Sequence, residues 1–193
     1  MSNIAIFASG SGSNAENIIR HFSGNKKANI KLIFTNNPDA YVIERAKNLN
    51  INCLIFNRED LYVTDKIFNV LISNKIDFIV LAGFIWLVPD NIIKAYERRI
   101  VNIHPALLPA YGGKGMYGDR VHKAVINNQE KESGITIHFV NQHYDEGDII
   151  FQAKCTVEKG DSPESLAKKV HALEYKYFPT VIENILEGSQ FSD

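Results

Sequence analysis

The stretch NIAIFASGSGSNAENIIRHFS, residues 3–23, decides the fold class of this chain. Its apolar start predicts a buried strand at 3–8, and its second half predicts a helix at 13–23, where apolar side chains recur every three or four positions. Between them, GSGSNA matches G-x-G-x-x-[GA], a pattern typical of loops that hold a phosphate at the start of a helix. A strand, a Gly-rich loop and a helix in this order predict the first unit of an α/β sheet with a ligand at its edge.

The same alternation continues through the following eighty or so residues. Further expected strands cover 30–35, 52–56, 77–83 and 99–105, and further expected helices cover 40–49 and 59–74. The strands read as continuous apolar runs, as expected for strands that are buried on both faces. Strand–helix alternation implies parallel strands with right-handed crossovers, so the sequence predicts a doubly wound, mostly parallel α/β sheet.

The pattern changes after the fifth strand. A Gly-rich loop at 110–119 precedes an expected helix at 119–128. Two longer apolar stretches, at 134–140 and 148–158, suggest a hairpin that adds an antiparallel C-terminal extension to the sheet.

A final helix is expected to begin with Ser162-Pro163-Glu164, because proline is favoured at the first helical position. Pro179 is expected to kink or divide this helix, which then resumes to about Glu187. No repeat, linker or low-complexity tract interrupts the chain, so we expect a single domain over residues 1–193.

The composition narrows the classes of partner and compartment. The net charge of −1 gives no basis for a polyanionic partner, so no nucleic acid is expected. No apolar run approaches 18 residues and no basic, apolar leader opens the chain, so we expect a soluble, cytoplasmic protein without a membrane partner. Cys53 and Cys155 lie in apolar contexts without C-x-x-C spacing and are expected to be buried, reduced thiols.

The end of the second strand helps to identify the ligand of the Gly-rich loop. An NAD site of the usual type needs an acidic residue there, for the ribose hydroxyl. Asn36 and Asn37 occupy this place, and Asp39 comes late, after a proline. Ser13 and Asn14 add side-chain donors that a pyrophosphate loop does not require. A phosphate monoester at the helix N-terminus is therefore favoured over NAD.

The fifth strand ends in NIHP, which carries the first candidate catalytic groups. Asn102 and His104 are two positions apart and so share one face of the strand. An asparagine can donate to an oxyanion and a histidine can transfer a proton near neutral pH, although the same pair also fits a core-edge histidine with a capping asparagine. Asp145, in the turn between the hairpin strands, would orient the His104 ring and raise its pKa. This turn, DEGD, holds three acids, and the sequence does not decide which one points inward.

A metal site is the alternative for these residues. His138 and His143 could join His104 and Asp145 as ligands, but the spacing matches no helical zinc motif. The two added histidines would also face opposite sides of a continued strand, so no metal is expected. The remaining histidines are expected on or near helix surfaces unless the fold brings one to the site: His21, His122 and His171.

Five motifs together resemble the phosphoribosylglycinamide formyltransferases, also called glycinamide ribonucleotide transformylases. They are GSGSN (10–14), LAGFIWLVP (81–89), NIHPALLPAY (102–111), GITIHFV with DEGDII (134–150) and EYKYFP (174–179). The resemblance runs in order from residue 3 to about 188. It implies a Rossmann-like, formyltransferase-type domain that transfers a formyl group from 10-formyltetrahydrofolate to the amine of glycinamide ribonucleotide in purine biosynthesis. It also implies small-molecule substrates, no metal, and a monomer or homodimer.

The resemblance implies roles for individual residues. The residues that match the family's catalytic trio are Asn102, His104 and Asp145. Those that match its substrate contacts are Gly12, Ser13 and Asn14 at the phosphate, and Glu174 at the glycinamide substrate. Those that match its folate cleft are Ile85, Trp86, Leu87, Val88 and Asn102, with residues 141–145 closing the other side. The implied chemistry is direct acyl transfer, with Asn102 and protonated His104 stabilising the oxyanion and Asp145 managing the protons.

Three positions depart from the family's common pattern. The loop at 110–119 is longer and carries four glycines, which predicts mobility before substrate binds. Trp86 stands where many relatives carry another side chain, so it is expected either to matter little or to pack beneath the folate. Arg58 corresponds only loosely, with shifted spacing, to a family arginine.

Rival functions remain at this stage. A methionyl-tRNA formyltransferase is disfavoured, because it would need a second, basic domain, and a 10-formyltetrahydrofolate hydrolase would need a regulatory domain before the first strand. A non-catalytic NAD- or nucleotide-binding module is the alternative from another class.

Overall fold

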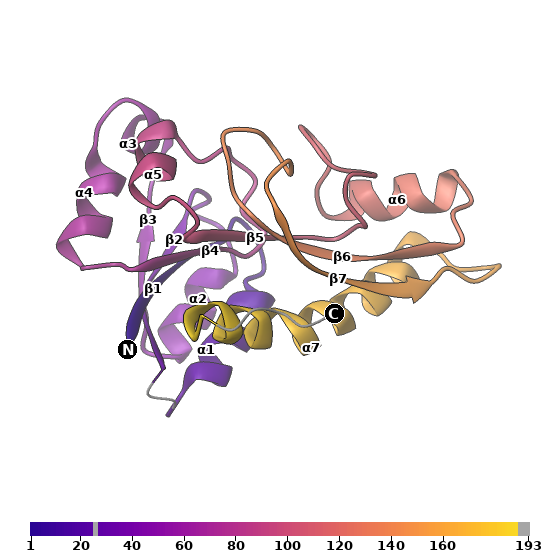
Figure 1. Ribbon diagram of the computed structural model, residues 1–193, viewed down its shortest axis with the longest axis horizontal. Helices are drawn as coiled ribbons and strands as arrows, with labels where there is room; N and C mark the ends of the chain where they lie inside the picture. The colour runs from indigo at the N-terminus through magenta and orange to yellow at the C-terminus, as the bar shows by residue number, and fades with distance from the viewer. Residues whose placement is uncertain (25–26, 189–193) are drawn as a thin grey trace.

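The computed structural model describes residues 1–24 and 27–188, which form one mixed sheet flanked by helices (Figure 1). The strands are β1 (Ser2–Phe7), β2 (Ala28–Thr35), β3 (Asn52–Ile55), β4 (Phe78–Leu81), β5 (Ile100–His104), β6 (Glu132–Phe139) and β7 (Ile149–Thr156). The helices are α1 (Ser13–Phe22), α2 (Val42–Asn48), α3 (Arg58–Tyr62), α4 (Lys66–Ser73), α5 (Asp90–Ala95), α6 (Asp119–Asn127) and α7 (Pro163–Leu186).

The sheet has the strand order β3-β2-β1-β4-β5-β6-β7. The first five strands in the chain pair in parallel, whereas β6 pairs antiparallel with β5 and β7 pairs antiparallel with β6. The expected mostly parallel sheet with an antiparallel C-terminal extension is thereby confirmed. The chain moves outward from β1 to β3 and then restarts on the other side of β1 at β4, so the strand order reverses beside β1. A reversal of this kind opens a crevice at the carboxyl ends of the two strands.

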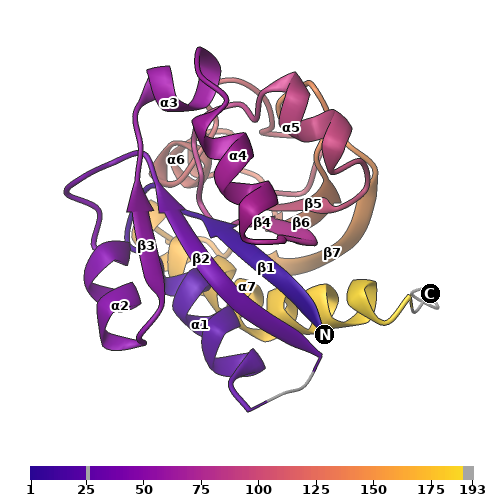
Figure 2. The same cartoon turned by 90° about the vertical axis from the view of Figure 1, so that its left-hand side faces the viewer.

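Helices cover both faces of the sheet (Figure 2), and their apolar side chains bury it in two layers. On one face, α1, α2 and α7 contribute side chains such as Ile18, Ala46 and Phe178. On the other face, α3, α4 and α5 contribute side chains such as Leu71 and Ile92. Because strands β1 and β4 contact both layers, their residues are apolar at every position from Ile4 to Phe7 and from Phe78 to Leu81, as the continuous runs predict.

The expected helix at 59–74 is wrong in one respect, because it is two helices, α3 and α4. Asn57 and Asp60 form a capping box that starts α3. Thr64 then ends it: its main-chain N–H donates to the Glu59 carbonyl, and its hydroxyl lies 3.4 Å from the carbonyl oxygens of Glu59 and Asp60. These carbonyls are therefore satisfied locally, and the helix is not continued. The sequence analysis predicted no range for helix α5, which lies at Asp90–Ala95.

Pro179 does not divide the last helix, because α7 is continuous from Pro163 to Leu186. A proline has no N–H to donate to the carbonyl four residues earlier, which here is that of Tyr175. The side chain of Asn17, on α1, supplies the missing donor at 2.9 Å. A neighbouring helix thus satisfies the group that the proline leaves free.

The two cysteines are free, as expected, but each is only half-buried. Burial raises the pKa of the Cys53 thiol to about 11.

Candidate active site

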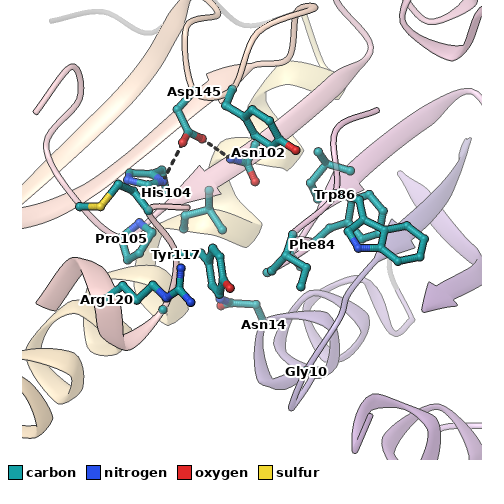
Figure 3. Close-up of a pocket in the computed structure, with 18 of the residues that line it drawn as sticks. Gly10, Asn14, Phe84, Trp86, Asn102, His104, Pro105, Tyr117, Arg120 and Asp145 are labelled. Atoms are coloured by element: carbon teal, nitrogen blue, oxygen red, sulfur yellow. Dashed lines mark hydrogen bonds and ion pairs between the residues drawn. The ribbon is translucent and has the colours of Figure 1, made fainter. Parts of the chain in front are cut away.

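A cavity of about 550 Å³ opens at the carboxyl ends of the central strands (Figure 3). It is lined by the loop after β1, the segment after β4, the end of β5, the Gly-rich loop before α6, the turn after β6, and one face of α7. The cavity therefore lies where the strand order reverses, which is the expected place for a ligand in a sheet of this type.

Asn102, His104 and Asp145 meet in this cavity, as Figure 3 shows. The Asn102 Nδ2 atom lies 3.3 Å from Asp145 Oδ1, and His104 Nδ1 lies 3.5 Å from Asp145 Oδ2. The main-chain N–H of Gly113 also donates to Asp145 Oδ2, at 3.0 Å. Of the three acids in DEGD, Asp145 is the one that points inward, whereas the Asp148 side chain is 74% exposed and pairs with Arg98.

His138 is an additional member of this group that the sequence suggested only as a metal ligand. The antiparallel register places it directly opposite Asn102, and its Nε2 lies 3.1 Å from Asn102 Nδ2. Its Nδ1 donates to the Phe139 carbonyl at 2.8 Å, so in the neutral ring Nε2 is the acceptor for the Asn102 amide. Both hydrogens of that amide are thus engaged, one by His138 and one by Asp145.

The pKa of His104 is shifted in the direction opposite to the one expected from the sequence. The ring is 3% exposed, and this burial lowers the pKa of His104 more than the nearby Asp145 raises it. The predicted rise in pKa is therefore wrong in its net direction. His104 Nε2 donates to the Tyr111 carbonyl at 2.8 Å, so the neutral ring carries its proton on Nε2 and leaves Nδ1 free beside Asp145.

Asp145 is the permanent charge of the group. Its burial raises the pKa of the carboxyl, but the neighbouring imidazole rings of His138 and His104 and the Gly113 N–H together hold that pKa below its usual value. Asp145 also has a φ of +58°, in the left-handed region that aspartate tolerates better than most residues. The tight turn after β6 is what brings its carboxylate back over β5.

The Gly-rich loop after β1 forms the opposite end of the cavity. Gly12 has a φ of +72° and directly precedes α1, with no side chain capping the helix. The first-turn N–H groups of α1 therefore have no internal acceptor, and they carry the positive end of the helix dipole. Ser13 and Asn14 line the cavity beside them, so this end suits an anion.

Glu174 connects this loop to α7. It is 4% exposed, and its Oε2 accepts a hydrogen bond from Asn14 Nδ2 at 2.8 Å. His171, one turn earlier on the helix, places its Nδ1 2.8 Å from the same oxygen. This hydrogen bond to Glu174 is the main reason why the pKa of His171 is raised. The fold thus brings His171 to the cavity, together with His122 of α6, whereas His21 pairs with Glu183 outside it.

The segment after β4 forms an aromatic wall. Trp86 packs against Phe56 with ring centroids 5.9 Å apart, and the Arg58 guanidinium lies 4.8 Å from the Trp86 ring centre. Two main-chain groups of the segment are already engaged, because the Ile85 N–H donates to Ser9 Oγ and the Leu87 carbonyl accepts from Tyr62. Ile85, Trp86, Leu87 and Val88 all line the cavity, as do Arg58 and residues 143–145.

The loop at 110–119 covers the cavity. Gly113 to Gly118 line it, and Figure 3 shows Tyr117 and Arg120 directed toward Asn14. The Arg120 guanidinium lies 4.9 Å from the Tyr117 ring centre. Lys114 and Tyr117 of this loop both line the cavity.

The structure also places the residues that the sequence analysis weighed for a dinucleotide and for a metal. Asn37 is engaged with the loop itself, since its Nδ2 lies 3.4 Å from the Ser9 carbonyl, and Asp39 is exposed. Over residues 1–24 and 27–188, no three His, Cys, Asp or Glu side chains are grouped as a metal would require.

A family model described as formyl transferase matches residues 2–182. The chain belongs to the formyl transferase family. The matched residues include every group placed in the cavity above, from the loop after β1 to Glu174 on α7.

Individual members of the formyl transferase family are similar over nearly the whole chain. The phosphoribosylglycinamide formyltransferase of Bacillus subtilis is 35% identical, over 96% of this chain and 95% of its own. The chloroplastic phosphoribosylglycinamide formyltransferase of Arabidopsis thaliana is 41% identical over 95% of this chain, which spans 65% of that relative's length. The crystal structure of the Bacillus halodurans phosphoribosylglycinamide formyltransferase has a TM-score of 0.86 at 37% identity, over 96% of this chain and 95% of its own. The resemblance inferred from the motifs is confirmed.

The described residues of this formyl transferase family member include no helix both long and apolar enough to cross a bilayer.

Proposed function

We propose that this protein transfers the formyl group of 10-formyltetrahydrofolate to the primary amine of glycinamide ribonucleotide. The products are formylglycinamide ribonucleotide and tetrahydrofolate, and the reaction belongs to purine biosynthesis. The observation that carries the proposal is the convergence, in one cavity, of an anion-binding helix N-terminus with Asn102, His104 and Asp145. The names of the relatives support the same reaction.

The ribonucleotide is assigned to the end formed by α1. Its phosphate would bind the first-turn N–H groups at Gly12, Ser13 and Asn14, where the helix dipole favours a negative charge. Glu174 would contact the sugar or glycinamide part, because its carboxylate lies between that loop and the catalytic group.

The formyl folate is assigned to the cleft between residues 85–88 and residues 141–145. Trp86 offers the ring system an apolar wall, and Arg58 offers a positive charge toward the carboxylate end of the folate. Asn102 lies between this cleft and the ribonucleotide end, which is where the formyl carbon must meet the amine.

The amine would attack the formyl carbon, and the carbonyl oxygen would become an oxyanion as the new C–N bond forms. Asn102 would donate to that oxyanion by exchanging its longer hydrogen bond, the one to Asp145 at 3.3 Å. His104 Nδ1 would take the proton released by the amine, because in the neutral ring this is the unprotonated nitrogen.

Asp145 would stabilise the resulting imidazolium from 3.5 Å. The imidazolium could also support the oxyanion and would then give its proton to N10 of the folate, as the bond from N10 to the formyl carbon breaks. No covalent enzyme intermediate is needed, and neither Cys53 nor Cys155 lines the cavity.

A spectrophotometric assay with a 10-formyl folate, run with and without glycinamide ribonucleotide, tests the proposal. Folate product that forms only when the ribonucleotide is present, and that is lost in Asn102→Ala, would support it. Equal release without the ribonucleotide would replace it with a hydrolase activity. Absence of turnover in both assays would leave a non-catalytic nucleotide-binding module.

A further inference from the structure

Helix α2 holds the loop after β1 from behind. The Gly10 carbonyl accepts a hydrogen bond from the Val42 main-chain N–H at 3.2 Å, and the Ser11 carbonyl accepts one from Arg45 Nε at 2.8 Å. Residues 10–14 line the cavity, whereas Arg45 is not among the lining residues. Arg45 therefore contacts the loop on the side away from the ligand.

The hydrogen bond from Arg45 sets the direction of one N–H group in the cavity. The Ser11–Gly12 peptide bond is trans, so its carbonyl and its N–H point in opposite directions. Because the Ser11 carbonyl points to Arg45, the Gly12 N–H points away from it. Gly12 is buried and lines the cavity, and no group among residues 1–24 and 27–188 accepts this N–H. The Gly12 N–H is thus left for a ligand.

Glycine makes the opposite orientation of this peptide accessible. A half-turn of the peptide plane changes mainly ψ of Ser11 and φ of Gly12, and glycine adopts φ of either sign. After such a rotation the Ser11 carbonyl oxygen would face the cavity and repel an anion. The hydrogen bond from the charged Arg45 guanidinium opposes the rotation, because charge-assisted hydrogen bonds are stronger than neutral ones.

Glu16, in the first turn of α1, holds Arg45 in this position. Arg45 Nη1 donates to Glu16 Oε2 while Arg45 Nε donates to Ser11. Arg20 binds the other oxygen, Oε1, through Nε and Nη2 at 2.9 and 2.7 Å. These hydrogen bonds, from Arg20 first and then from Arg45, lower the pKa of Glu16, so its carboxylate is charged near pH 7. A lysine could not replace Arg45, because a single ammonium group lacks the planar fork that binds both partners.

We propose that Arg45 is a positioning residue that keeps the Ser11–Gly12 peptide turned with its N–H toward the phosphate of the ribonucleotide. This inference rests on the proposed function, which assigns the phosphate to this loop. Arg45 touches no substrate, and its effect reaches the phosphate through the Gly12 N–H. Loss of Arg45 should therefore weaken the binding of ligands that carry a phosphate and leave the formyl transfer step unchanged.

The kinetic test compares wild-type protein with Arg45→Met and Arg45→Lys on two substrates, glycinamide ribonucleotide and glycinamide riboside, which lacks the phosphate. For Arg45→Met we expect KM for the ribonucleotide to rise about 10- to 100-fold, the value of one hydrogen bond to a charged group. The kcat should stay within about threefold of wild type, because only binding has changed. On the riboside, KM for this variant and for wild type should agree within about threefold. Arg45→Lys keeps the charge but loses the fork, so it should show most of the same rise in KM.

Arg20→Met is the matched control. It removes the same charge and the other partner of Glu16, but Arg20 makes no hydrogen bond to the loop after β1. Its KM for the ribonucleotide should stay within about twofold of wild type, since exposed ion pairs contribute little.

A binding measurement with inorganic phosphate does not require formyl transfer. In ¹H–¹⁵N spectra of wild-type protein, phosphate should shift the Gly12 amide signal in a saturable way. In Arg45→Met the apparent Kd for phosphate should be about 10-fold higher or more, whereas in Arg20→Met it should match wild type.

Several outcomes would overturn the inference. An unchanged KM for the ribonucleotide in Arg45→Met would show that the loop keeps its orientation without Arg45. Equal losses on ribonucleotide and riboside would mark a general structural role, and wild-type behaviour of Arg45→Lys would leave only an effect of charge. An equal loss in Arg20→Met would point to the ion-pair network instead of Ser11. Failure of wild type to formylate the ribonucleotide would overturn the proposed function, and the phosphate titration would then still decide the role of Arg45.

Discussion

His104 has two neighbours with opposite effects on its proton. The surrounding apolar groups favour the neutral ring, and Asp145 favours the imidazolium. Because burial has the larger effect, the neutral ring is favoured. In the proposed mechanism this ring accepts the proton from the amine, and Asp145 then stabilises the imidazolium. A histidine of ordinary pKa would already be partly protonated near pH 6.5 and unable to act as a base.

The first residue-scale prediction concerns pH. The His104 ring must be neutral to act as a base, so activity should fall as pH drops through its lowered pKa. The acidic limb of kcat/KM against pH should thus lie below 6.5. In Asp145→Asn the charge that raises the His104 pKa is gone, so this limb should move to still lower pH while kcat falls. A limb that moves to higher pH would mean that another group titrates.

The second residue-scale prediction concerns the oxyanion. Asn102→Ala removes the amide donor, and His104→Ala removes the base, so each should lower kcat about 100- to 1,000-fold. Circular dichroism should show both variants folded. A variant that retains more than about a tenth of wild-type kcat would remove that residue from the catalytic group.

The sequence predicted that Asn102, His104 and Asp145 lie together, which the structure shows, but it did not predict their supporting contacts. Asn102 and His104 are readable because two residues of one strand share a face, and Asp145 because it lies in the adjoining turn. His138 was missed as a partner of Asn102, since their pairing depends on the β5–β6 register, which no local pattern fixes. His122 was expected on or near a helix surface, but it is buried and lines the cavity, because an amphipathic helix pattern does not show what lies across a cavity.

At the scale of elements, the turn from β1 to α1 requires Gly12. Its backbone is left-handed, and a Cβ there would overlap the Val42 side chain at the start of α2. The sequence motif identified this turn, because a glycine pattern reports a backbone requirement directly. The break between α3 and α4 was not visible, because it depends on a threonine side chain binding carbonyls of the preceding turn.

Alanine substitutions in this turn test the requirement. Gly12→Ala should lower the free energy of unfolding by about 1–3 kcal/mol, from backbone strain and the overlap with Val42. Gly10→Ala is the matched control, because a Cβ there meets nothing within 4 Å, and it should change stability by less than about 0.5 kcal/mol. Urea unfolding of both proteins measures the difference. Equal losses would show that the turn does not depend on the conformation of Gly12.

At the scale of the whole molecule, α7 connects distant parts of the sequence. It packs on the sheet through Phe178, accepts a hydrogen bond from α1 through its Tyr175 carbonyl, and carries Glu174 into the cavity. This arrangement supports the proposal that residues 1–193 form a single domain. Sequence periodicity identified α7 but not its continuity, because the group that compensates for Pro179 comes from Asn17.

If the chain is a single domain, it should unfold in one cooperative transition. Trp86 is the only tryptophan, so its fluorescence reports on the cavity wall while far-UV circular dichroism reports on the whole chain. The two urea curves should coincide. In Phe178→Ala both curves should shift together to lower urea concentration. The shift should correspond to a loss of about 3–5 kcal/mol in the free energy of unfolding, because Phe178 is fully buried. Tyr175→Ala, on an exposed face of the same helix, should shift them much less, and separated curves would contradict a single domain.

The described hydrogen bonds from the Gly-rich loop to His104 and Asp145 both come from its main chain. The Tyr111 carbonyl fixes the His104 proton on Nε2, and the Gly113 N–H holds Asp145. Since every amino acid except proline supplies both groups, the side chains of this loop can diverge during evolution while the chemistry beside them is preserved. Gly112 is an exception, because a Cβ there would press on Leu108 and Asp145. In the proposed enzyme, substrate preference could therefore change during evolution without loss of the main-chain hydrogen bonds to His104 and Asp145.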